Sequence, residues 1–264
     1  MASFVLPHEL HGSGPHKVFA VHGWFADRGA YAPVIADLDR SAFEYALVDL
    51  RGYGEARDAG GAYTTQEGAA DVIELADRLG WERFSVVGHS MGGNVAQRIL
   101  AAAPDRLRRM VGISPVPASG FPLPPEQQDL FSGASHAPEN RRTILDVTSG
   151  GARPAAWLDR MTERSIEVSD AKAFGAWLES WAGEDFHTEV EGATVPALAV
   201  AGAIDPAISS DLLRATWMNW YPHAELAELP ACGHYAMDET PLALVRAMED
   251  FLRADGPGDG ATHA

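Results

Sequence analysis

Short apolar runs alternate with longer amphipathic segments along most of the chain, and this alternation constrains the fold more than any other feature of the sequence. Most positions in these runs are apolar, which is typical of strands buried on both faces of a parallel sheet. The runs lie at residues 18–21, 45–48, 84–87, 110–113 and 197–201, with a more polar run at 224–229 that suits an edge strand. Helices are expected between them, at residues 31–38, 65–79, 91–102, 209–220 and 241–253. We therefore predict an α/β fold with a predominantly parallel sheet flanked by helices on both faces.

One long segment, from residue 116 to residue 186, interrupts this rhythm and contains no clear strand. It opens with the Pro-rich turn VPASGFPLPP and continues with helical stretches at residues 126–131, 138–147, 154–166 and 170–181. Because it follows the strand at 110–113, it should emerge at the carboxyl edge of the sheet. The predicted organisation is a core formed by residues 1–115 and 187–254, a helical cap formed by 116–186, and a Gly-rich, disordered tail at 255–264.

The composition argues against several classes of function. A formal net charge of −17 would repel nucleic acid and anionic membranes, so neither is an expected partner. Cys232 is the only cysteine, so no intramolecular disulfide can form, and no Cys/His cluster indicates a metal site. The N-terminus does not resemble a signal peptide, and no apolar run approaches the ~18 residues of a membrane span. We expect a cytoplasmic protein that uses no cofactor and acts on a small molecule; its oligomeric state is left open.

The stretch FSVVGHSMGGNVAQ, at residues 84–97, places one serine directly after a predicted strand and before a predicted helix. A strand that turns sharply into a helix holds the turn residue in a strained conformation, and Gly88 and Gly92 provide the room for this at Ser90. The Ser90 hydroxyl should therefore project from the carboxyl edge of the sheet. The pattern G-x-S-x-G in this context is typical of a nucleophile elbow. The structural alternative is a Gly-rich turn with an N-capping serine.

A serine needs a base to act as a nucleophile near neutral pH, and the base needs an acid to orient it. For an elbow of this type, the chain order is serine, acid, histidine. His234 follows the last predicted strand and Asp205 follows the strand at 197–201, so both belong to the same edge of the sheet as Ser90. Asp238 is a weaker candidate for the acid because it is better placed to cap the final helix. We predict Ser90, Asp205 and His234 as the catalytic residues.

Acyl transfer also requires N–H donors for the oxyanion that develops in the transition state. The N–H of Met91 lies at the start of the helix that follows Ser90 and points towards the same space. After the first clear strand comes His22-Gly23-Trp24, in which the glycine allows a close approach of the backbone. We predict that the backbone N–H groups of Trp24 and Met91 form the oxyanion hole.

With these motifs in place, the sequence resembles the α/β-hydrolase superfamily, in its lidded single-domain branch, over about residues 15–253. The motifs that carry the resemblance are HGW at 22–24, DLRGYGEA at 49–56, GHSMGG at 88–93, GAIDP at 202–206 and CGH at 232–234. The family usually begins with two more strands, and the residues before 15 leave room for a short hairpin at best. Haloalkane dehalogenases and epoxide hydrolases of this fold use an aspartate at the elbow, so a serine there argues against those activities.

The resemblance implies a serine hydrolase that cleaves a carboxylic ester or lactone through an acyl-enzyme. Two alternatives stay open: the same triad could hydrolyse a carbon–carbon bond in a diketone-like substrate, or the protein could sense a small ligand with slow turnover. We expect a largely apolar substrate pocket, lined by Trp24, Phe25, Met91, Trp157, Trp177 and Trp181. The tryptophans of the cap are equally suited to packing the cap onto the sheet.

Overall fold

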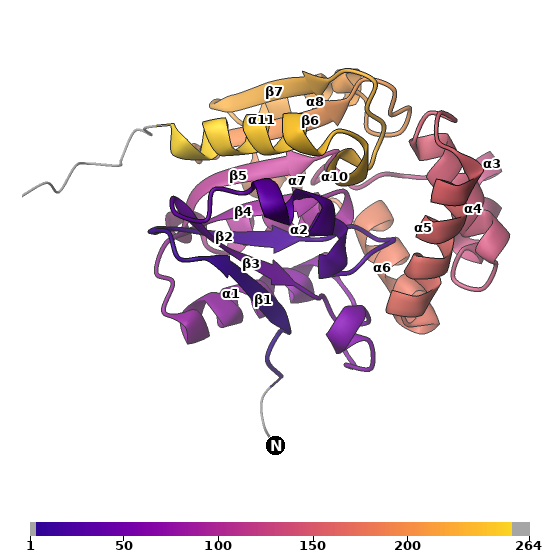
Figure 1. Ribbon diagram of the computed structural model, residues 1–264, viewed down its shortest axis with the longest axis horizontal. Coiled ribbons are helices and arrows are strands. Elements are labelled where there is room, and N and C mark those ends of the chain that lie inside the picture. The colour runs from indigo at the N-terminus through magenta and orange to yellow at the C-terminus, as the bar shows by residue number, and fades with distance from the viewer. Residues whose placement is uncertain (1–3, 255–264) are drawn as a thin grey trace, which may run out of the picture.

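The computed structural model describes residues 4–254, and the predicted disordered tail at 255–264 lies outside them. Within this part of the chain, the strands form one seven-stranded sheet in the order β1-β3-β2-β4-β5-β6-β7 (Figure 1). Strand β1 runs antiparallel to β3, and all the other neighbouring strands are parallel. The strands are β1 (His8–Gly12), β2 (His16–Val21), β3 (Phe43–Val48), β4 (Phe84–His89), β5 (Leu107–Ile113), β6 (Ala197–Gly202) and β7 (Ala224–Leu229). The predicted α/β class with a predominantly parallel sheet is confirmed.

Both faces of the sheet are covered because successive side chains of a strand point to opposite sides. In β2, for example, Val21 belongs to one buried cluster and Ala20 to another. The first cluster contains residues of α1 (Thr65–Leu79), α2 (Met91–Ala102), α7 (His187–Val190), α8 (Ser210–Ala215) and α9 (Trp217–Trp220). The second contains residues of η1 (Arg28–Asp37), α10 (Ala236–Glu239) and α11 (Pro241–Arg253). Two short 3₁₀ turns, η2 (Gly54–Ala56) and η3 (Pro104–Arg106), lie in loops.

Two of the expected core helices differ from the prediction in their details. The segment predicted as a helix at 31–38 belongs to the 3₁₀ helix η1, which contains Pro33. Proline lacks the N–H that a regular α-helix uses, so a tighter and shorter-range helix is favoured here. The helix predicted at 209–220 is broken at Thr216, whose φ of −113° and ψ of −86° are not helical, and the segment forms α8 and α9 instead.

The N-terminal residues, which leave room for a short hairpin at best, form one strand and no hairpin within the described part of the chain. Strand β1 does not pair with β2 but with β3, in a register that places His8 opposite Val48, so β3 separates the first two strands of the chain. The sequence of β1 is HELHG, and its residues are only partly buried or exposed because the strand lies at the edge of the sheet. It therefore lacks the continuous apolar pattern that identified the central strands.

Four helices lie between β5 and the short helix α7, before the chain returns to the sheet at β6. They are α3 (Pro125–Gly133), α4 (Pro138–Thr148), α5 (Ala155–Val168) and α6 (Ala171–Gly183). Figure 1 shows them gathered on one side of the sheet, beyond the ends of the strands, rather than on either of its faces. The segment that interrupts the strand–helix alternation in the sequence therefore forms one group of helices beyond one end of the strands (Figure 1).

One of the close backbone approaches that hold this arrangement lies at Gly92, in the first turn of α2. A Cβ atom at this position would lie 2.4 Å from the carbonyl oxygen of Val21 and 2.7 Å from that of His22. Overpacking of this kind typically costs about 1–3 kcal/mol. We therefore expect Gly92→Ala to lower the free energy of unfolding by at least about this amount in urea titrations. Gly183→Ala is the control, since nothing lies within 4 Å of a Cβ there; equal stabilities of the two variants would contradict the prediction.

Candidate active site

Ser90 occupies the turn between β4 and α2 and has an unusual backbone conformation, with φ of +52° and ψ of −115°. A non-glycine residue in this region of φ is strained and is kept there only by its surroundings. The N–H of Ser90 donates to the carbonyl of Ile113 at 2.9 Å, and its own carbonyl accepts from Gly93 and Val116 at 2.9 and 3.0 Å. Gly88 has no room for a side chain, because a Cβ there would lie 2.1 Å from the carbonyl oxygen of Gly92. The local sequence thus forces a sharp turn that presents the serine at the end of β4.

His234 and Asp205 form a buried hydrogen-bonded pair beside this turn. Nδ1 of His234 lies 2.7 Å from Oδ2 of Asp205, and Oδ1 of Asp205 accepts from the backbone N–H groups of Ala207 and Ile208 at 2.9 and 3.2 Å. Burial raises the pKa of the Asp205 carboxyl, but the charge and hydrogen bond of His234 and the two backbone donors outweigh it, so that this pKa is lowered below its ordinary value. The carboxylate can only accept, so Nδ1 of His234 carries the proton and Nε2 is left with a free lone pair.

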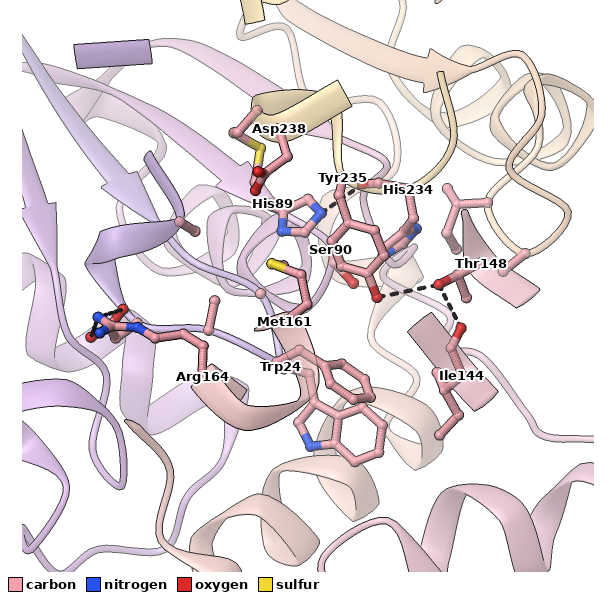
Figure 2. Close-up of a pocket in the computed structure, with 18 of the residues that line it drawn as sticks. Trp24, His89, Ser90, Ile144, Thr148, Met161, Arg164, His234, Tyr235 and Asp238 are labelled. Atoms are coloured by element: carbon pink, nitrogen blue, oxygen red, sulfur yellow. Dashed lines mark hydrogen bonds and ion pairs between the residues drawn. The ribbon is translucent and has the colours of Figure 1, made fainter. Parts of the chain in front are cut away.

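Ser90 and His234 line the same cavity, which has a volume of about 280 Å³ (Figure 2). Its wall is mostly apolar and is contributed by both the sheet edge and the four helices that follow β5. The apolar side chains that line it include Trp24, Phe25, Val116, Phe121, Phe131, Ile144, Met161, Trp181, Ile208 and Met237. A cavity of this size and lining, with a few polar groups at one place, is typical of a site for a small organic ligand.

The loop that follows β2 brings its backbone against the serine. A Cβ atom at Gly23 would lie 2.7 Å from Nδ1 of His89 and 3.2 Å from Cβ of Ser90, so glycine favours this close approach. The next residue, Trp24, is buried, and its indole N–H donates to the carbonyl of Phe174 in α6 at 2.8 Å. Met91 is the first residue of α2, where the N–H groups have no partner within the helix. The loop of Gly23 and Trp24 and the first residue of α2, Met91, thus both lie beside Ser90.

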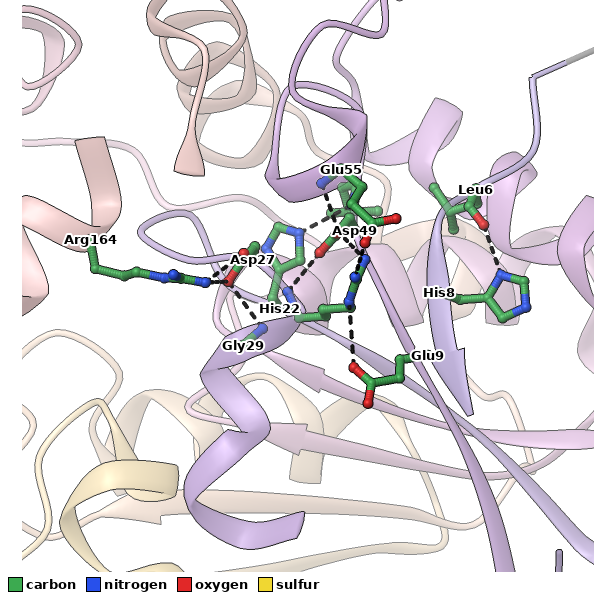
Figure 3. A network of polar contacts seen from close by, with 11 residues as sticks. Leu6, His8, Glu9, His22, Asp27, Gly29, Asp49, Glu55 and Arg164 are labelled. Atoms are coloured by element: carbon green, nitrogen blue, oxygen red, sulfur yellow. Dashed lines mark hydrogen bonds and ion pairs between the residues drawn. The ribbon is translucent and has the colours of Figure 1, made fainter. Parts of the chain in front are cut away.

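The same loop is fixed from the core by a polar network (Figure 3). Asp49, which follows β3, accepts hydrogen bonds from the backbone N–H groups of Arg28 and Glu55, each at 2.9 Å, and forms an ion pair with the Arg28 guanidinium. His22 accepts from the N–H of Leu50 at 3.1 Å, and burial lowers the pKa of His22, which keeps the ring neutral for this role. His22 therefore has a structural task in the loop.

Three of the predicted pocket residues line the cavity, and three do not. Trp24, Phe25 and Trp181 are lining residues, whereas the side chains of Met91, Trp157 and Trp177 lie elsewhere. Met91 is fully buried inside the core. The Met91 side chain therefore does not line the cavity as predicted. Its backbone N–H lies at the start of α2.

Trp177 and Trp157 have packing roles that helical periodicity alone could not reveal. Trp177 is 1% exposed, and its indole N–H donates to the carbonyl of Arg51 at 2.9 Å, while the ring lies against Gly68 of α1. It thereby fixes α6 to the core. Trp157 is partly buried and lies at 5.5 Å, between ring centroids, from Tyr235. The prediction that these two tryptophans line the pocket is corrected: both join the helical segment to the core.

Sequence reasoning missed two ion pairs where the cavity meets solvent. Nη2 of Arg164 lies 2.9 Å from Oδ2 of Asp27, and Nη2 of Arg160 lies 3.6 Å from Oδ1 of Asp238. Both arginines line the cavity from α5, together with Met161 between them in sequence. Their spacing places them on one face of a helix, which is a pattern that the sequence contains. Their carboxylate partners lie far away in the chain, so no local pattern indicates the pairs.

Sequence reasoning also missed the contact between α4 and the loop that carries His234. The N–H of His234 donates to the carbonyl of Thr148 at 3.1 Å, and the hydroxyls of Thr148 and Tyr235 lie 3.2 Å apart (Figure 2). The Thr148 hydroxyl donates to the carbonyl of Ile144 at 2.7 Å, so Tyr235 is the donor in the second contact. The end of α4 therefore holds the main chain of His234 directly.

Among residues 4–254, no group of three or more His, Cys, Asp or Glu side chains is placed to hold a metal ion. None of the helices in the described part of the chain is sufficiently long and apolar to cross a membrane.

The sheet order, the strained serine and the His–Asp pair define the chain as an α/β protein with a serine-centred site. Residues 18–241 match the family model for the alpha/beta hydrolase fold, and the chain is an enzyme that belongs to this family. The predicted superfamily is thereby confirmed.

Known proteins similar to this chain include hydrolases of two kinds. A pimeloyl-(acyl-carrier protein) methyl ester esterase of Nitrosomonas europaea is 31% identical over 86% of this chain and 91% of its own length. A 2-hydroxy-6-oxononadienedioate/2-hydroxy-6-oxononatrienedioate hydrolase of Cupriavidus pinatubonensis is 28% identical over 92% of this chain and 85% of its own. Among solved structures, an esterase from Exiguobacterium antarcticum superimposes with a TM-score of 0.84 at 19% identity, covering 94% of this chain and 96% of that one. This last likeness concerns the fold.

The corrected role of Trp177 predicts a large effect on stability. Truncating a buried tryptophan typically costs about 3–5 kcal/mol. We expect Trp177→Ala to lower the free energy of unfolding by about this amount in urea titrations, and Trp157→Ala to lower it less, because that ring is only partly buried. An unchanged stability of Trp177→Ala would show that the ring does not fix α6 to the core.

Proposed function

We propose that the protein is a serine hydrolase of a carboxylic ester or lactone, with Ser90, His234 and Asp205 as its catalytic triad. The observation that carries the proposal is the joint position of a strained elbow serine and a buried His–Asp pair at one apolar cavity. Nε2 of His234 has its lone pair free to take the proton of the Ser90 hydroxyl, while Asp205 holds the ring in this tautomer and stabilises its charged form.

The reaction then follows in two halves. The Ser90 oxygen attacks the carbonyl carbon, and the N–H groups of Trp24 and Met91 hold the negative charge that forms on the carbonyl oxygen. His234 returns its proton to the leaving alcohol oxygen as the carbon–oxygen bond breaks, which leaves an acyl-enzyme. In the second half, His234 takes a proton from water, the resulting attack releases the acid, and Ser90 recovers its proton. In a lactone, the leaving hydroxyl stays attached to the acyl group.

The lining of the cavity supports a small, largely apolar substrate. Aromatic and aliphatic side chains surround the serine, and the charged groups at the opening are paired as Arg164 with Asp27 and Arg160 with Asp238. Because these charges compensate one another, a small uncharged ester can enter the cavity without displacing an unpaired charge. The methyl ester esterase among the relatives supports ester cleavage as the chemistry.

We propose further that residues 116–186 act as a cap that selects the substrate. Helices α3 to α6 contribute lining residues to the cavity, whereas the triad belongs to the sheet edge. In this proposal the core carries out the reaction, and the cap determines the shape of the cavity and so the substrate that fits. Trp181, which lines the cavity and lies 5.3 Å from the Trp24 ring between centroids, is the cap residue best placed to define the acyl subsite.

Hydrolysis of a carbon–carbon bond in a diketone-like substrate is the second candidate, because a relative that is 28% identical over 92% of this chain is named as a hydrolase of the keto acid 2-hydroxy-6-oxononadienedioate. The same serine, base and oxyanion donors would serve it. Comparing kcat/KM for methyl and p-nitrophenyl esters, lactones and a vinylogous diketone acid separates the two chemistries. A protein that binds these compounds with negligible turnover would instead support the sensor alternative.

The first test is Ser90→Ala. Loss of a triad nucleophile typically lowers the rate by about 10⁴–10⁶. We expect the variant to lose turnover of p-nitrophenyl esters to this extent, while its circular dichroism and melting temperature show a folded protein. Ser114→Ala is a matched control, because Ser114 is a buried serine that also has a positive φ, of +40°, yet lies outside the cavity lining. Undiminished turnover by Ser90→Ala would refute the assignment of the nucleophile.

The second test concerns the cap. Removing the Trp181 indole enlarges the cavity, so Trp181→Ala should shift the ratio of kcat/KM values towards bulky acyl groups and away from short ones. One buried contact with a substrate is worth about 1–3 kcal/mol, which corresponds to roughly 10–200-fold in this ratio. Trp157→Ala is the control, because that side chain is not a lining residue. An identical ranking of substrates in wild type and Trp181→Ala would place the acyl subsite elsewhere in the cavity.

A further inference from the structure

His89 is a buried side chain at the centre of the site to which the proposed mechanism gives no role. It lies between the glycine and the serine of the elbow, is 3% exposed and lines the cavity (Figure 2). Its ring lies 5.1 Å from the His234 ring between centroids. An apolar side chain would fill this space at a lower cost of desolvation, because the polar atoms of a buried ring lose their hydrogen bonds to water and need partners in the protein.

One nitrogen of His89 is engaged with the main chain of the proposed base. Nε2 lies 2.8 Å from the carbonyl oxygen of His234, and because a carbonyl only accepts, Nε2 carries the proton. Burial, followed by the charge of His234, lowers the pKa of His89 to about 3. The ring therefore stays neutral near physiological pH and keeps one fixed tautomer, with Nε2 as donor and Nδ1 without a proton.

The opposite side of the ring faces the loop that carries the oxyanion donor. A Cβ atom at Gly23 would lie 2.7 Å from Nδ1 of His89, so the backbone of this loop is packed directly against the ring. Among the described residues, Nδ1 has no hydrogen-bond partner. The unprotonated Nδ1 presents no hydrogen on this side, which leaves the room that the backbone at Gly23 occupies next to Trp24.

His89 is thus a spacer between two loops that are distant in the sequence, one ending in the oxyanion donor and the other in the base. The peptide of His234 is held from both sides: its carbonyl accepts from His89, and its N–H donates to the carbonyl of Thr148 in α4. Both contacts act on the main chain, so they fix the position from which the imidazole side chain projects, whereas Asp205 fixes only its orientation.

We propose that His89 is a positioning residue that sets the separation between Ser90, the base His234 and the oxyanion donor Trp24. The inference rests on the proposed function. Displacement of a catalytic group by about 1 Å can lower a rate by about 100-fold, so loss of the His89 donor should act on kcat, while substrate binding by the cavity wall is left largely intact.

The test compares His89→Gln with His89→Met. The glutamine amide can place an N–H donor at about the reach of Nε2, whereas methionine has a similar length and no donor. We expect His89→Met to lower kcat for a p-nitrophenyl ester by about 10–100-fold with KM changed by less than about threefold, and His89→Gln to retain about a third or more of the wild-type kcat. Active-site concentrations are determined by titration with a serine-reactive phosphonate, so that an unfolded fraction does not enter kcat.

His16→Met is the matched control for losing a buried histidine. His16 is 8% exposed and lies 2.7 Å from the hydroxyl of Ser85, but it stands at the amino end of β2, away from the site. It should lower the melting temperature and leave kcat per active site unchanged. If His89→Met does not fold, His89→Leu is the second donor-free variant, and the glutamine variant is judged against it.

The outcomes separate this inference from the function on which it rests. Ester turnover that is absent in the wild type, or that survives Ser90→Ala, would reject the proposed function and this role with it. If the wild type is active and Ser90→Ala is not, three results would overturn the role of His89 alone. In the first, His89→Met has the same kcat as the wild type or as His16→Met. In the second, the effect of His89→Met appears only in KM. In the third, His89→Gln folds but is as slow as the donor-free variant.

Discussion

The strained backbone of Ser90 is the constraint on which the rest of the site depends. A conformation of this kind costs about 1–3 kcal/mol and persists only where neighbouring contacts over-determine it. Here the main chain of Ser90 is bonded to Ile113 and Val116, and Gly88 and Gly92 allow β4, α2 and β2 to approach closely enough to keep the turn sharp. The serine cannot relax without moving three strands of the sheet, so the stability of the whole core holds it in place.

Around this fixed point, the remaining groups come from loops that are held by the cap as well as by the core. The cap accepts the N–H of His234 at Thr148, and it accepts the indole N–H of Trp24 at Phe174. The helical segment is therefore bonded to the loop of the proposed base and to the loop of the proposed oxyanion donor. A movement of the cap would disturb both loops, whereas Ser90 would be disturbed less, because its main chain is bonded to Ile113 of β5, to Gly93 of α2 and to Val116 at the very start of the cap.

The sequence allowed the fold and the meeting of Ser90, Asp205 and His234 to be predicted, because each lies in the segment that follows a parallel strand and parallel strands end at one edge. The contacts of the cap were harder to predict from the sequence. Its helices were recognisable from breakers and periodicity, but periodicity shows that Trp177 and Trp181 are buried and not what covers them. In the structure, Trp177 packs against the core and Trp181 lines the cavity. Strand β1 escaped prediction because an edge strand needs no continuous apolar pattern.

The distribution of charge completes the physical picture of the site. The protein carries a formal charge of −17, yet the charged side chains at the opening of the cavity are two arginines paired with two aspartates. Their charges cancel within a short distance, so the strong negative field of the surface is locally compensated where a ligand enters. Behind them the wall is apolar, and an electrostatic interaction is stronger there than in water. The pair of Asp205 and His234 and the backbone dipoles beside Ser90 therefore lie in surroundings that favour stabilisation of a charge that develops during reaction. An entrance with paired charges and an apolar interior also suit the uncharged ester of the proposed function.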